Sequence, residues 1–328
     1  MNARTSRFLA VAATLLTVAT FSVADSEWLL RFGLDEGGTH RFAMNQTQSM
    51  DIDMGAMGRQ QMENSARMEF LQTVKEMLPD GSIVLDTTFG RMHTKVSMGG
   101  MSMEFDTESD EEAAHPVAAF QKFLQGKHVV VTMSPRGLVR SVEGLEAILD
   151  DLSEALPDQP GNPQAMEAIK QGFGAEATTA LMQQAVVPYP EDAVAIGDTW
   201  HQNLKLPNPA LGDLNIKRSY TVEGAERMQE RDCLKLGVSS TIEFEGGGPE
   251  FAQFGQMFGA ELVFDIDEAS GRGTVWIDRN SGVVVLSKST QTIEMDMLLE
   301  KSGSEGVEGQ SLDMRATVTQ HIEVELLD

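Results

Sequence analysis

The stretch from Gly271 to Leu299, GRGTVWIDRNSGVVVLSKSTQTIEMDMLL, constrains the fold more than any other part of the chain. Runs of β-branched residues flank a polar turn at 278–282, where Gly282 supplies the positive φ that a bulged hairpin turn needs. The second strand can extend from Val283 to Leu299, about 17 residues where five or six are usual. A strand of this length favours a strongly curved sheet or a half-closed barrel.

Several other segments alternate between apolar and polar residues, and the C-terminal segment is the clearest. Its apolar residues share one parity: Met314, Ala316, Val318, Ile322, Val324 and Leu326. A strand is also predicted at Thr39–Asp53, where the apolar residues are mostly at even positions. Further strands are predicted at His128–Met133, before the turn SPRG, and, as a short strand before a turn, at Trp28–Leu34. One dry and one wet face indicate an antiparallel sheet that is covered on a single side.

Helical periodicity is confined to the middle of the chain, at about 143–187. Leu145, Ile148, Leu149, Leu152 and Leu156 follow i, i+3, i+4, i+7, i+11 spacing and form one apolar stripe. Further short helices are expected after Asn162-Pro163 and around 175–186. Each has one apolar side that the sheet can cover. The prediction is therefore an α+β fold, a strongly curved and mostly antiparallel sheet with two or three short helices packed on it.

The N-terminus predicts export. Arg4 and Arg7 precede an apolar run from Phe8 to Val23, and Ser22-Val23-Ala24 has the pattern of a signal-peptidase site. We therefore expect a signal peptide at 1–24 and a single domain at 25–328, in the periplasm or outside the cell. An uncleaved anchor is the alternative, although the run is shorter than a typical span of ~20 residues. No cysteine follows the run, so no lipidated N-terminus is expected.

Charge and cysteine content restrict the partners. Without the two signal-peptide arginines the chain has 23 Lys+Arg and 50 Asp+Glu, a net charge of 23 − 50 = −27. Such a field repels phosphate backbones and anionic lipid surfaces, so no nucleic acid partner is expected. No segment after the signal peptide is long and apolar enough to cross a membrane, so no stable membrane insertion is expected either. Cys233 is the only cysteine, which excludes an internal disulfide.

Enzyme signatures are absent from the sequence. It contains no G-x-S-x-G elbow, no P-loop and no G-x-G-x-x-G, and its six histidines are scattered. Asp265 and Asp267 weakly resemble part of a calcium loop, but alternation places both on the outer strand face. No base accompanies Cys233. We predict a protein that is not an enzyme and has no cofactor.

The layout resembles a known group. A hairpin SPRGLVRSVEG is followed by helices, a Pro-rich approach to IGDTW (Ile196 to Trp200) and a G-x-G-x-x-W-x-D-x-x-x-G-like hairpin (Gly273 to Val284). This order is similar to that of uncharacterised secreted bacterial proteins classed as a domain of unknown function with a LolA-like, lipoprotein-carrier-like half-barrel. The resemblance implies an open barrel of roughly eleven strands with helices at its mouth. In the lipoprotein carriers that hollow holds acyl chains, so a lipid role follows by fold analogy.

The long strand carries one clue to a hollow. Its odd-numbered face is apolar at both ends but small and polar at Ser287 and Ser289, where a packed core would need apolar bulk. A hollow or a crossing helix tolerates small residues there. The residues expected to line a ligand cavity are Leu262, Phe264, Ile266, Val318, Ile322, Ser287, Ser289 and Met295. A glycine-rich hinge at 246–248 precedes a candidate lid or partner contact, made by Phe251, Phe254, Met257 and Phe258. The alternative is a loop that tucks these side chains into the core.

Methionine is unusually frequent, with 20 copies. The thioethers of Met54, Met57, Met98, Met101 and Met103 are spaced so that they could bind Cu(I) in an exported protein. The alternatives are the flexible lining of an apolar hollow and an ordinary core.

Three functions therefore remain open. The first is a non-catalytic exported protein that binds a lipid or another hydrophobic small molecule between sheet and helices. The second is a structural or protein-interaction module of the cell envelope with a filled core. The third is a methionine-rich Cu(I) binder.

Overall fold

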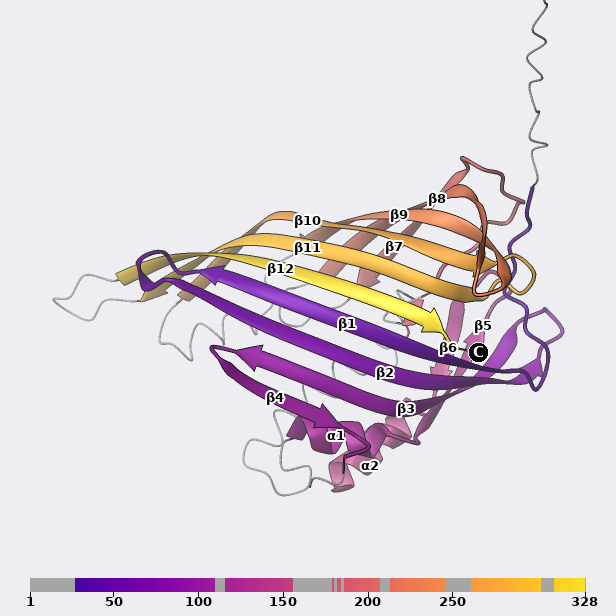
Figure 1. Ribbon diagram of the computed structural model, residues 1–328, viewed down its shortest axis with the longest axis horizontal. Helices are drawn as coiled ribbons and strands as arrows, with labels where there is room; N and C mark the ends of the chain where they lie inside the picture. Colours follow the sequence, from indigo (N-terminus) through magenta and orange to yellow (C-terminus); the bar gives the residue numbers. More distant parts are fainter. Residues whose placement is uncertain are drawn as a thin grey trace, which may run out of the picture.

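The computed structural model describes residues 27–109, 116–155, 179, 182–183, 186–206, 213–245, 261–301 and 310–327. They form one antiparallel sheet of twelve strands in the order β6-β5-β3-β2-β1-β12-β11-β10-β9-β8-β7, and β4 pairs with the remainder of β3 (Figure 1). The strands are β1 (Thr39–Asp53), β2 (Arg59–Met77), β3 (Ile83–Met98), β4 (Met101–Asp106), β5 (His128–Met133), β6 (Val139–Glu143), β7 (Thr199–Leu206), β8 (Asp213–Met228), β9 (Arg231–Glu245), β10 (Glu261–Asp278), β11 (Val284–Lys301) and β12 (Gln310–Leu326). This mostly antiparallel open sheet confirms the predicted fold class, with twelve strands where the resemblance implied about eleven.

The long hairpin predicted within residues 271–299 is present in the structure. β10 and β11 each have 18 residues and meet at a turn where Gly282 has a φ of +66°. Strand bounds were predicted without error at β1 and β5, because turn residues such as Gly37-Gly38 and Ser134-Pro135 border these runs.

The helices differ from the prediction in one respect. α2 (Leu145–Ala155) begins the predicted insert, but α1 (Pro116–Leu124) precedes it, so the helical part is not confined to 143–187. A three-residue 3-10 turn (Gly55–Met57) joins β1 to β2. Most of the later helical prediction lies outside the described residues. Among the described helices, none is long and apolar enough to cross a membrane.

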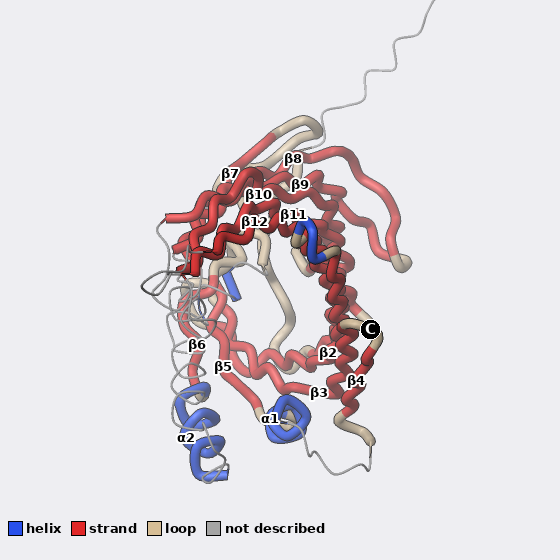
Figure 2. Tube along the Cα trace, turned by 90° about the vertical axis from the view of Figure 1, so that its left-hand side faces the viewer, coloured by secondary structure: helices blue, strands red, loops and turns tan. Residues whose placement is uncertain are grey.

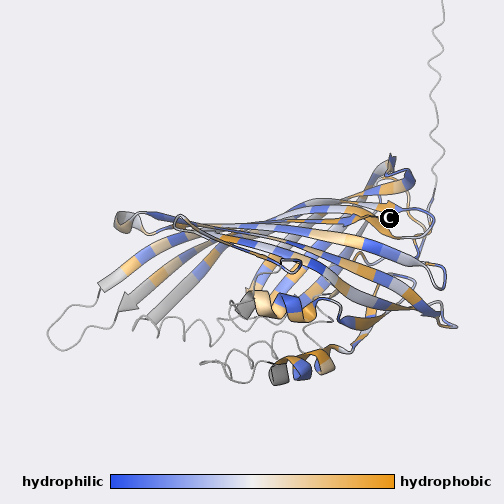
Figure 3. Cartoon of the chain, turned by 60° about the horizontal axis from the view of Figure 1, so that its bottom comes forward, coloured by the Kyte–Doolittle hydropathy of each residue, from blue (hydrophilic) through white to orange (hydrophobic). Residues whose placement is uncertain are grey.

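The two faces of the sheet differ in chemistry. Hydrophobic and hydrophilic residues alternate along the long strands (Figure 3). The helices contact the inner face, because the side-chain amide of Gln121 on α1 donates to Thr94 Oγ1 of β3 at 2.7 Å. The outer face carries exposed ion pairs such as Arg315 with Asp296 at 2.7 Å and Lys217 with Glu243 at 2.6 Å.

Two connecting segments, 27–38 and 186–198, pack on the inner face at one end of the sheet, which we call the packed end. Trp28 and Val194 form a bridge between the segments, Phe32 N–H donates to Pro135 O at 2.7 Å, and Gly33 N–H donates to Ser281 O at 2.9 Å. The predicted strand at Trp28–Leu34 is therefore wrong beyond this single bridge, because these residues bond to loops instead of a neighbouring strand. Figure 2 shows the strands curving around an interior that loop segments cross.

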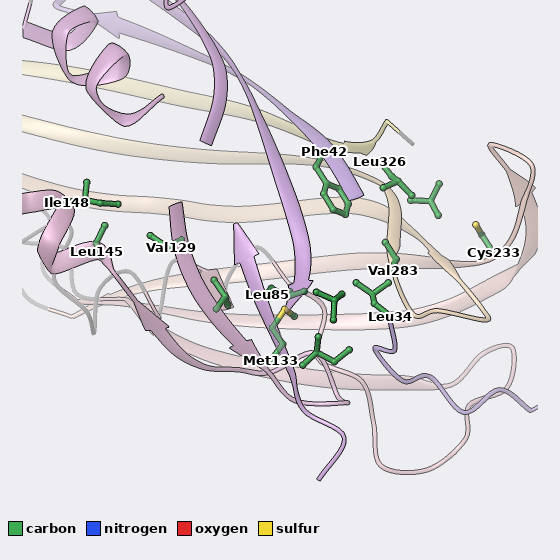
Figure 4. Close-up of a cluster of buried hydrophobic side chains, with 14 of the residues drawn as sticks. Leu34, Phe42, Leu85, Val129, Met133, Leu145, Ile148, Cys233, Val283 and Leu326 are labelled. Carbon is green, nitrogen blue, oxygen red and sulfur yellow. The ribbon is translucent and has the colours of Figure 1, made fainter. Parts of the chain in front are cut away.

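The packed end contains the main hydrophobic core. One cluster brings together residues of the N-terminal segment, α2 and strands from both halves of the sheet: Leu34, Phe42, Leu85, Val129, Leu145, Ile148, Val283 and Leu326 (Figure 4). A second cluster adds Tyr189, Tyr220, Leu234 and Ile277. The hydroxyl of Tyr189 donates to the Gly282 carbonyl, so the segment is fixed to the β10–β11 turn. The packed end is therefore stabilised by apolar contacts among connecting segments, a helix and strands.

The opposite end, which we call the far end, is built differently. It comprises the inner positions of β10, β11 and β12 at 262–269, 293–299 and 312–318, with their neighbours on β1 and β7–β9. Its two clusters centre on Ile242 and Met295, and all of their described members are strand residues. Within the described residues, no helix or connecting segment joins these clusters.

Candidate functional site

The inner face carries a continuous row of polar positions across eight strands. Register pairs link successive members of this row, which we call the polar belt: Asn64, Gln48, Gln320, Gln291, Gly271, Ser240, Arg218 and Gln202. The belt separates the apolar rows of the packed end from those of the far end. Arg218 is its one charged member.

Beyond the belt, the inner face becomes apolar at once. The next row toward the far end contains Met62, Met50, Val318, Ile293, Ala269, Ile242, Ile216 and Leu204. Val318, Ala269, Ile242 and Ile216 are buried, whereas Met50, Ile293 and Leu204 are half-buried. The face therefore presents partly exposed apolar side chains beside a polar stripe.

The residues predicted to line a cavity all occupy inner register positions. Ser289 pairs with Ile322, Met295 pairs with Ile266, and Val318 pairs with Ile293. Ser287 lies on the packed-end side of the belt, and Leu262 and Phe264 hold the most distant far-end positions in the register. The sequence thus placed these residues on one face, while a ligand cavity among them stays a prediction.

The ends of the polar belt differ in their hydrogen bonding. At the β7–β8 end, the Tyr220 hydroxyl donates to Gln202 Oε1 at 2.8 Å, and Arg218 Nη1 donates to that hydroxyl at 3.3 Å. Gln202, which is 7% exposed, also donates through Nε2 to the Gln183 carbonyl at 3.3 Å. Burial raises the pKa of Tyr220, so the phenol stays protonated and keeps donating.

At the β2–β3 end, polar atoms are buried without partners. Asn64 Oδ1 and Gln121 Oε1 are both acceptors that no hydrogen bond satisfies. Leaving such an atom unsatisfied costs about 1–3 kcal/mol. This end of the belt can therefore accept hydrogen bonds that the described protein groups do not supply.

Gln183 also joins the two edges of the sheet. Its Oε1 accepts from the Val139 N–H of edge strand β6 at 2.8 Å, while its carbonyl accepts from Gln202 of edge strand β7. The inner face is therefore bordered by a hydrogen-bonded link between strands that are distant in the sheet.

Glycines bring the strands close at the centre of the belt. A Cβ atom on Gly271 would lie 2.5 Å from Ser240 Oγ and 3.2 Å from Gln291 Cγ. A Cβ on Gly273 would lie 2.5 Å from the Lys288 carbonyl oxygen. Only glycine fits this close approach, as is common where a sheet bends.

Two hollows lie mainly on the outer face. One, of about 510 Å³, is lined by outward residues such as Arg272, Lys288 and His321, and it reaches Ser289 and Ile322 between them. The other, of about 550 Å³, lies near Asp53, Asp296, Asp313 and Arg315. Among the described residues, no group of three or more His, Cys, Asp or Glu side chains is arranged to hold a metal ion.

The structure also describes the candidate calcium-loop aspartates and the candidate reactive cysteine. Asp265 and Asp267 are exposed on the outer face. Cys233 is fully buried, and this burial raises its pKa to about 11, which disfavours the reactive thiolate.

Of the candidate copper ligands, Met98 and Met101 are register partners in the β3–β4 hairpin. Met101 is 69% exposed, Met57 and Met103 are also exposed, and Met54 is half-buried. The structure does not describe the Met98 side chain, so a thioether site stays a prediction. The candidate lid residues Phe251, Phe254, Met257 and Phe258 lie outside the described residues.

The sequence did not reveal the belt as a whole. Asn64, Gln48, Gln320 and Arg218 each interrupt the apolar parity of a different strand, and this interruption was the available signal. Connecting them required the register between strands, which bulges at 266–268 and 222–224 shift.

Comparison with known protein families identifies the family of this chain. A family model described as a family of unknown function (DUF6263) matches residues 80–284. The chain belongs to this family. No curated protein matches.

Solved structures show only distant likeness to this family member. A lipovitellin structure described by its lipid–protein interactions matches with a TM-score of 0.43 and 11% identity, over 90% of this chain and 25% of the lipovitellin chain. The chain thus spans a quarter of that protein. DynF, from the dynemicin biosynthesis pathway of Micromonospora chersina, matches with a TM-score of 0.18 and 7% identity, over 95% of this chain and 92% of its own.

Proposed function

We propose that this DUF6263 protein is a non-catalytic exported protein that binds a lipid or another hydrophobic small molecule on the inner face of a LolA-like half-barrel. The observation that carries the proposal is the far end of that face. There, inner positions of seven neighbouring strands are apolar, and several remain half-buried. Burying such surface stabilises a complex by about 25 cal/mol per Å².

The far end is also shaped for an elongated ligand. Apolar inner residues continue along β11 from Ile293 through Met295 and Met297, and along β12 from Val318 to Leu312. The methionines suit a ligand of variable shape, because the thioether side chain is flexible and polarizable. An apolar strip of this kind provides contact along a chain, with few directional interactions.

Binding is tested with a fluorescent acyl chain, cis-parinaric acid, titrated into the mature full-length protein. Ile293→Asp places a charge on the inner face and is expected to weaken binding at least about tenfold, or 1.4 kcal/mol. Thr292→Asp is the matched control, because Thr292 is the neighbouring residue on the outer face of the same strand. Circular dichroism establishes that both variants are folded.

The proposal fails if wild-type protein does not bind the probe and if solvent extraction of the purified protein recovers no amphiphile. A structural or protein-interaction module with a filled core then becomes the better explanation. Equal weakening by both variants would also contradict binding at the inner face.

Export is part of the same proposal and has its own measurement. N-terminal sequencing of protein secreted or recovered from the periplasm is expected to begin at Asp25. A mature chain that begins at Met1 and remains in the membrane fraction would contradict cleavage.

A further inference from the structure

The ends of the polar belt offer different chemistry to a ligand. At the β7–β8 end, Arg218, Tyr220 and Gln202 are joined in a hydrogen-bond network that continues to the Gln183 carbonyl. At the β2–β3 end, Asn64 Oδ1 and Gln121 Oε1 are buried acceptors without a partner. Unmet capacity therefore has opposite character at the two ends, because the unpaired atoms at the β2–β3 end are acceptors, whereas Gln183 Nε2 beside the β7–β8 end is an unpaired donor.

The two unpaired acceptors belong to one neighbourhood. Gln121 Nε2 donates to Thr94 Oγ1 at 2.7 Å, which fixes the amide of Gln121 over β3. Thr94 pairs with Ala66, and Asn64 is the next residue of β2 on the same face. Such diagonal neighbours in a sheet are about 7–8 Å apart. Gln121, bonded to Thr94, therefore lies over a residue that is a diagonal neighbour of Asn64 on the inner face.

The side chains around this position are neutral. Val96 and Gln48 are the register partners of Asn64, and Gln320 follows Gln48 in the belt. Both unpaired atoms are acceptors, so they require O–H or N–H donors and disfavour a carboxylate or phosphate oxygen. An uncharged group that bears hydroxyls meets this requirement, and its burial does not incur the desolvation cost of a charge.

The space beside the belt fits a hydrocarbon chain. From Gln320 to Leu312, β12 advances eight residues, or roughly 27 Å at about 3.4 Å per residue. The hydrocarbon core of a bilayer is about 30 Å thick and contains two opposed acyl layers, so one extended chain is accommodated with room to spare. A headgroup at the belt would place its tail along the far end.

We propose that the ligand is a neutral amphiphile with a hydroxyl-bearing headgroup of the glycerol type. The headgroup donates to Asn64 Oδ1 and Gln121 Oε1, and the acyl tail lies over the far-end rows that begin at Met50, Val318 and Ile293. This inference rests on the proposed function, since it specifies the ligand class of the same inner face.

The test compares three ligands that share one tail: monooleoylglycerol, oleate and methyl oleate. Displacement of cis-parinaric acid from the mature full-length protein gives an affinity for each. The wild-type protein is expected to bind monooleoylglycerol about tenfold more tightly than methyl oleate, a difference of 1.4 kcal/mol.

Two variants locate the headgroup. Asn64→Leu removes one unpaired acceptor at similar volume and is expected to reduce the preference for monooleoylglycerol to about threefold or less, with methyl oleate binding retained. Gln60→Leu makes the same type of change on the same face of β2, two rows from the belt, and is expected to leave the preference intact. Gln121→Met repeats the test from α1 if Asn64→Leu does not fold.

The outcomes separate the two proposals. If none of the three ligands binds, the proposed function fails and this inference fails with it. If methyl oleate binds as tightly as monooleoylglycerol, the headgroup inference is overturned while hydrophobic binding stands. A preference for oleate that Arg218→Gln removes would also overturn it, because the anionic class would then be the ligand.

Discussion

The packed end and the far end belong to the same strands and follow the same inward alternation, but they are covered in different ways. At the packed end, the segments 27–38 and 186–198 and helix α2 press on strands from both halves of the sheet. At the far end, the described contributors to each cluster are strand residues. The polar belt is the boundary between them. Alternation in the sequence therefore specifies an apolar face but does not specify which segments cover it.

We expect the end of the sheet that is covered by other segments to contribute more to the free energy of unfolding. The clusters at the packed end join connecting segments, α2 and strands, whereas the described members of the far-end clusters are strand residues alone. We therefore expect the packed end to stabilise the fold and the far end to remain available for a ligand.

Identical truncations on adjacent strands would reveal how differently the two ends are packed. Ile277 on β10 is 0% exposed at the packed end, and Ile293 on β11 is half-buried at the far end. Ile277→Ala is expected to lower the free energy of unfolding by about 2–5 kcal/mol, because a fully buried side chain leaves a cavity. Ile293→Ala should cost less than about half as much, as measured by urea denaturation. Equal losses would mean that the far end is as tightly packed as the other end.

A second pair tests how the N-terminal segment is held. Gly282 has a φ of +66°, and a Cβ there would lie 2.1 Å from the Arg31 carbonyl oxygen. Gly37 has a φ of +78° with nothing within 4 Å. Gly37→Ala should cost only the left-handed backbone strain, about 1–2 kcal/mol. Gly282→Ala must also displace the segment, so it should destabilise more.

The same two variants can be compared by limited proteolysis near residues 27–38. Faster cleavage in Gly282→Ala alone is the expected result. Equal cleavage rates would show that contact with the β10–β11 turn does not hold the segment.

Much of the sheet could be predicted, because apolar periodicity and the turn residues at each end are local features of a strand's own sequence. Thr39–Asp53 and His128–Met133 are examples, as is the long partner of the β10–β11 turn. The α1 helix was missed although Phe120, Phe123 and Leu124 have helical spacing. This run of nine residues is too short to show the repeated periods that make a helix evident.

The site could be predicted only in part. Ser287 and Ser289 lie at inner positions of β11, as their parity predicted, while the hollow inferred from them stays a prediction. The full belt depends on register across eight strands, and a one-residue shift would move any member to the outer face. The unpaired atoms of Asn64 and Gln121 depend on how α1 docks, which no local pattern encodes.

The smallest expected effect compares two aspartates under acid. Asp278 at the packed end is buried, which alone would raise its pKa, but hydrogen bonds from Asn280 N–H, Arg231 and Ser281 N–H outweigh burial and lower it. The hydrogen bond from Arg315 lowers the pKa of Asp296, which is exposed near the far end. A carboxyl with a lowered folded-state pKa stabilises the fold above its unfolded value, about 3.9, and loses that contribution as the pH falls through the folded-state pKa.

Asp278→Asn should therefore reduce the fall in unfolding free energy between about pH 5 and pH 2, because the lost partner of Arg231 is nearly buried. Asp296→Asn should leave the profile almost unchanged, since exposed ion pairs contribute about 0–1 kcal/mol. Urea denaturation at several pH values measures both. A larger change for Asp296→Asn would reverse the comparison, because acid sensitivity would then reside in the part of the sheet whose apolar clusters are made by strand residues.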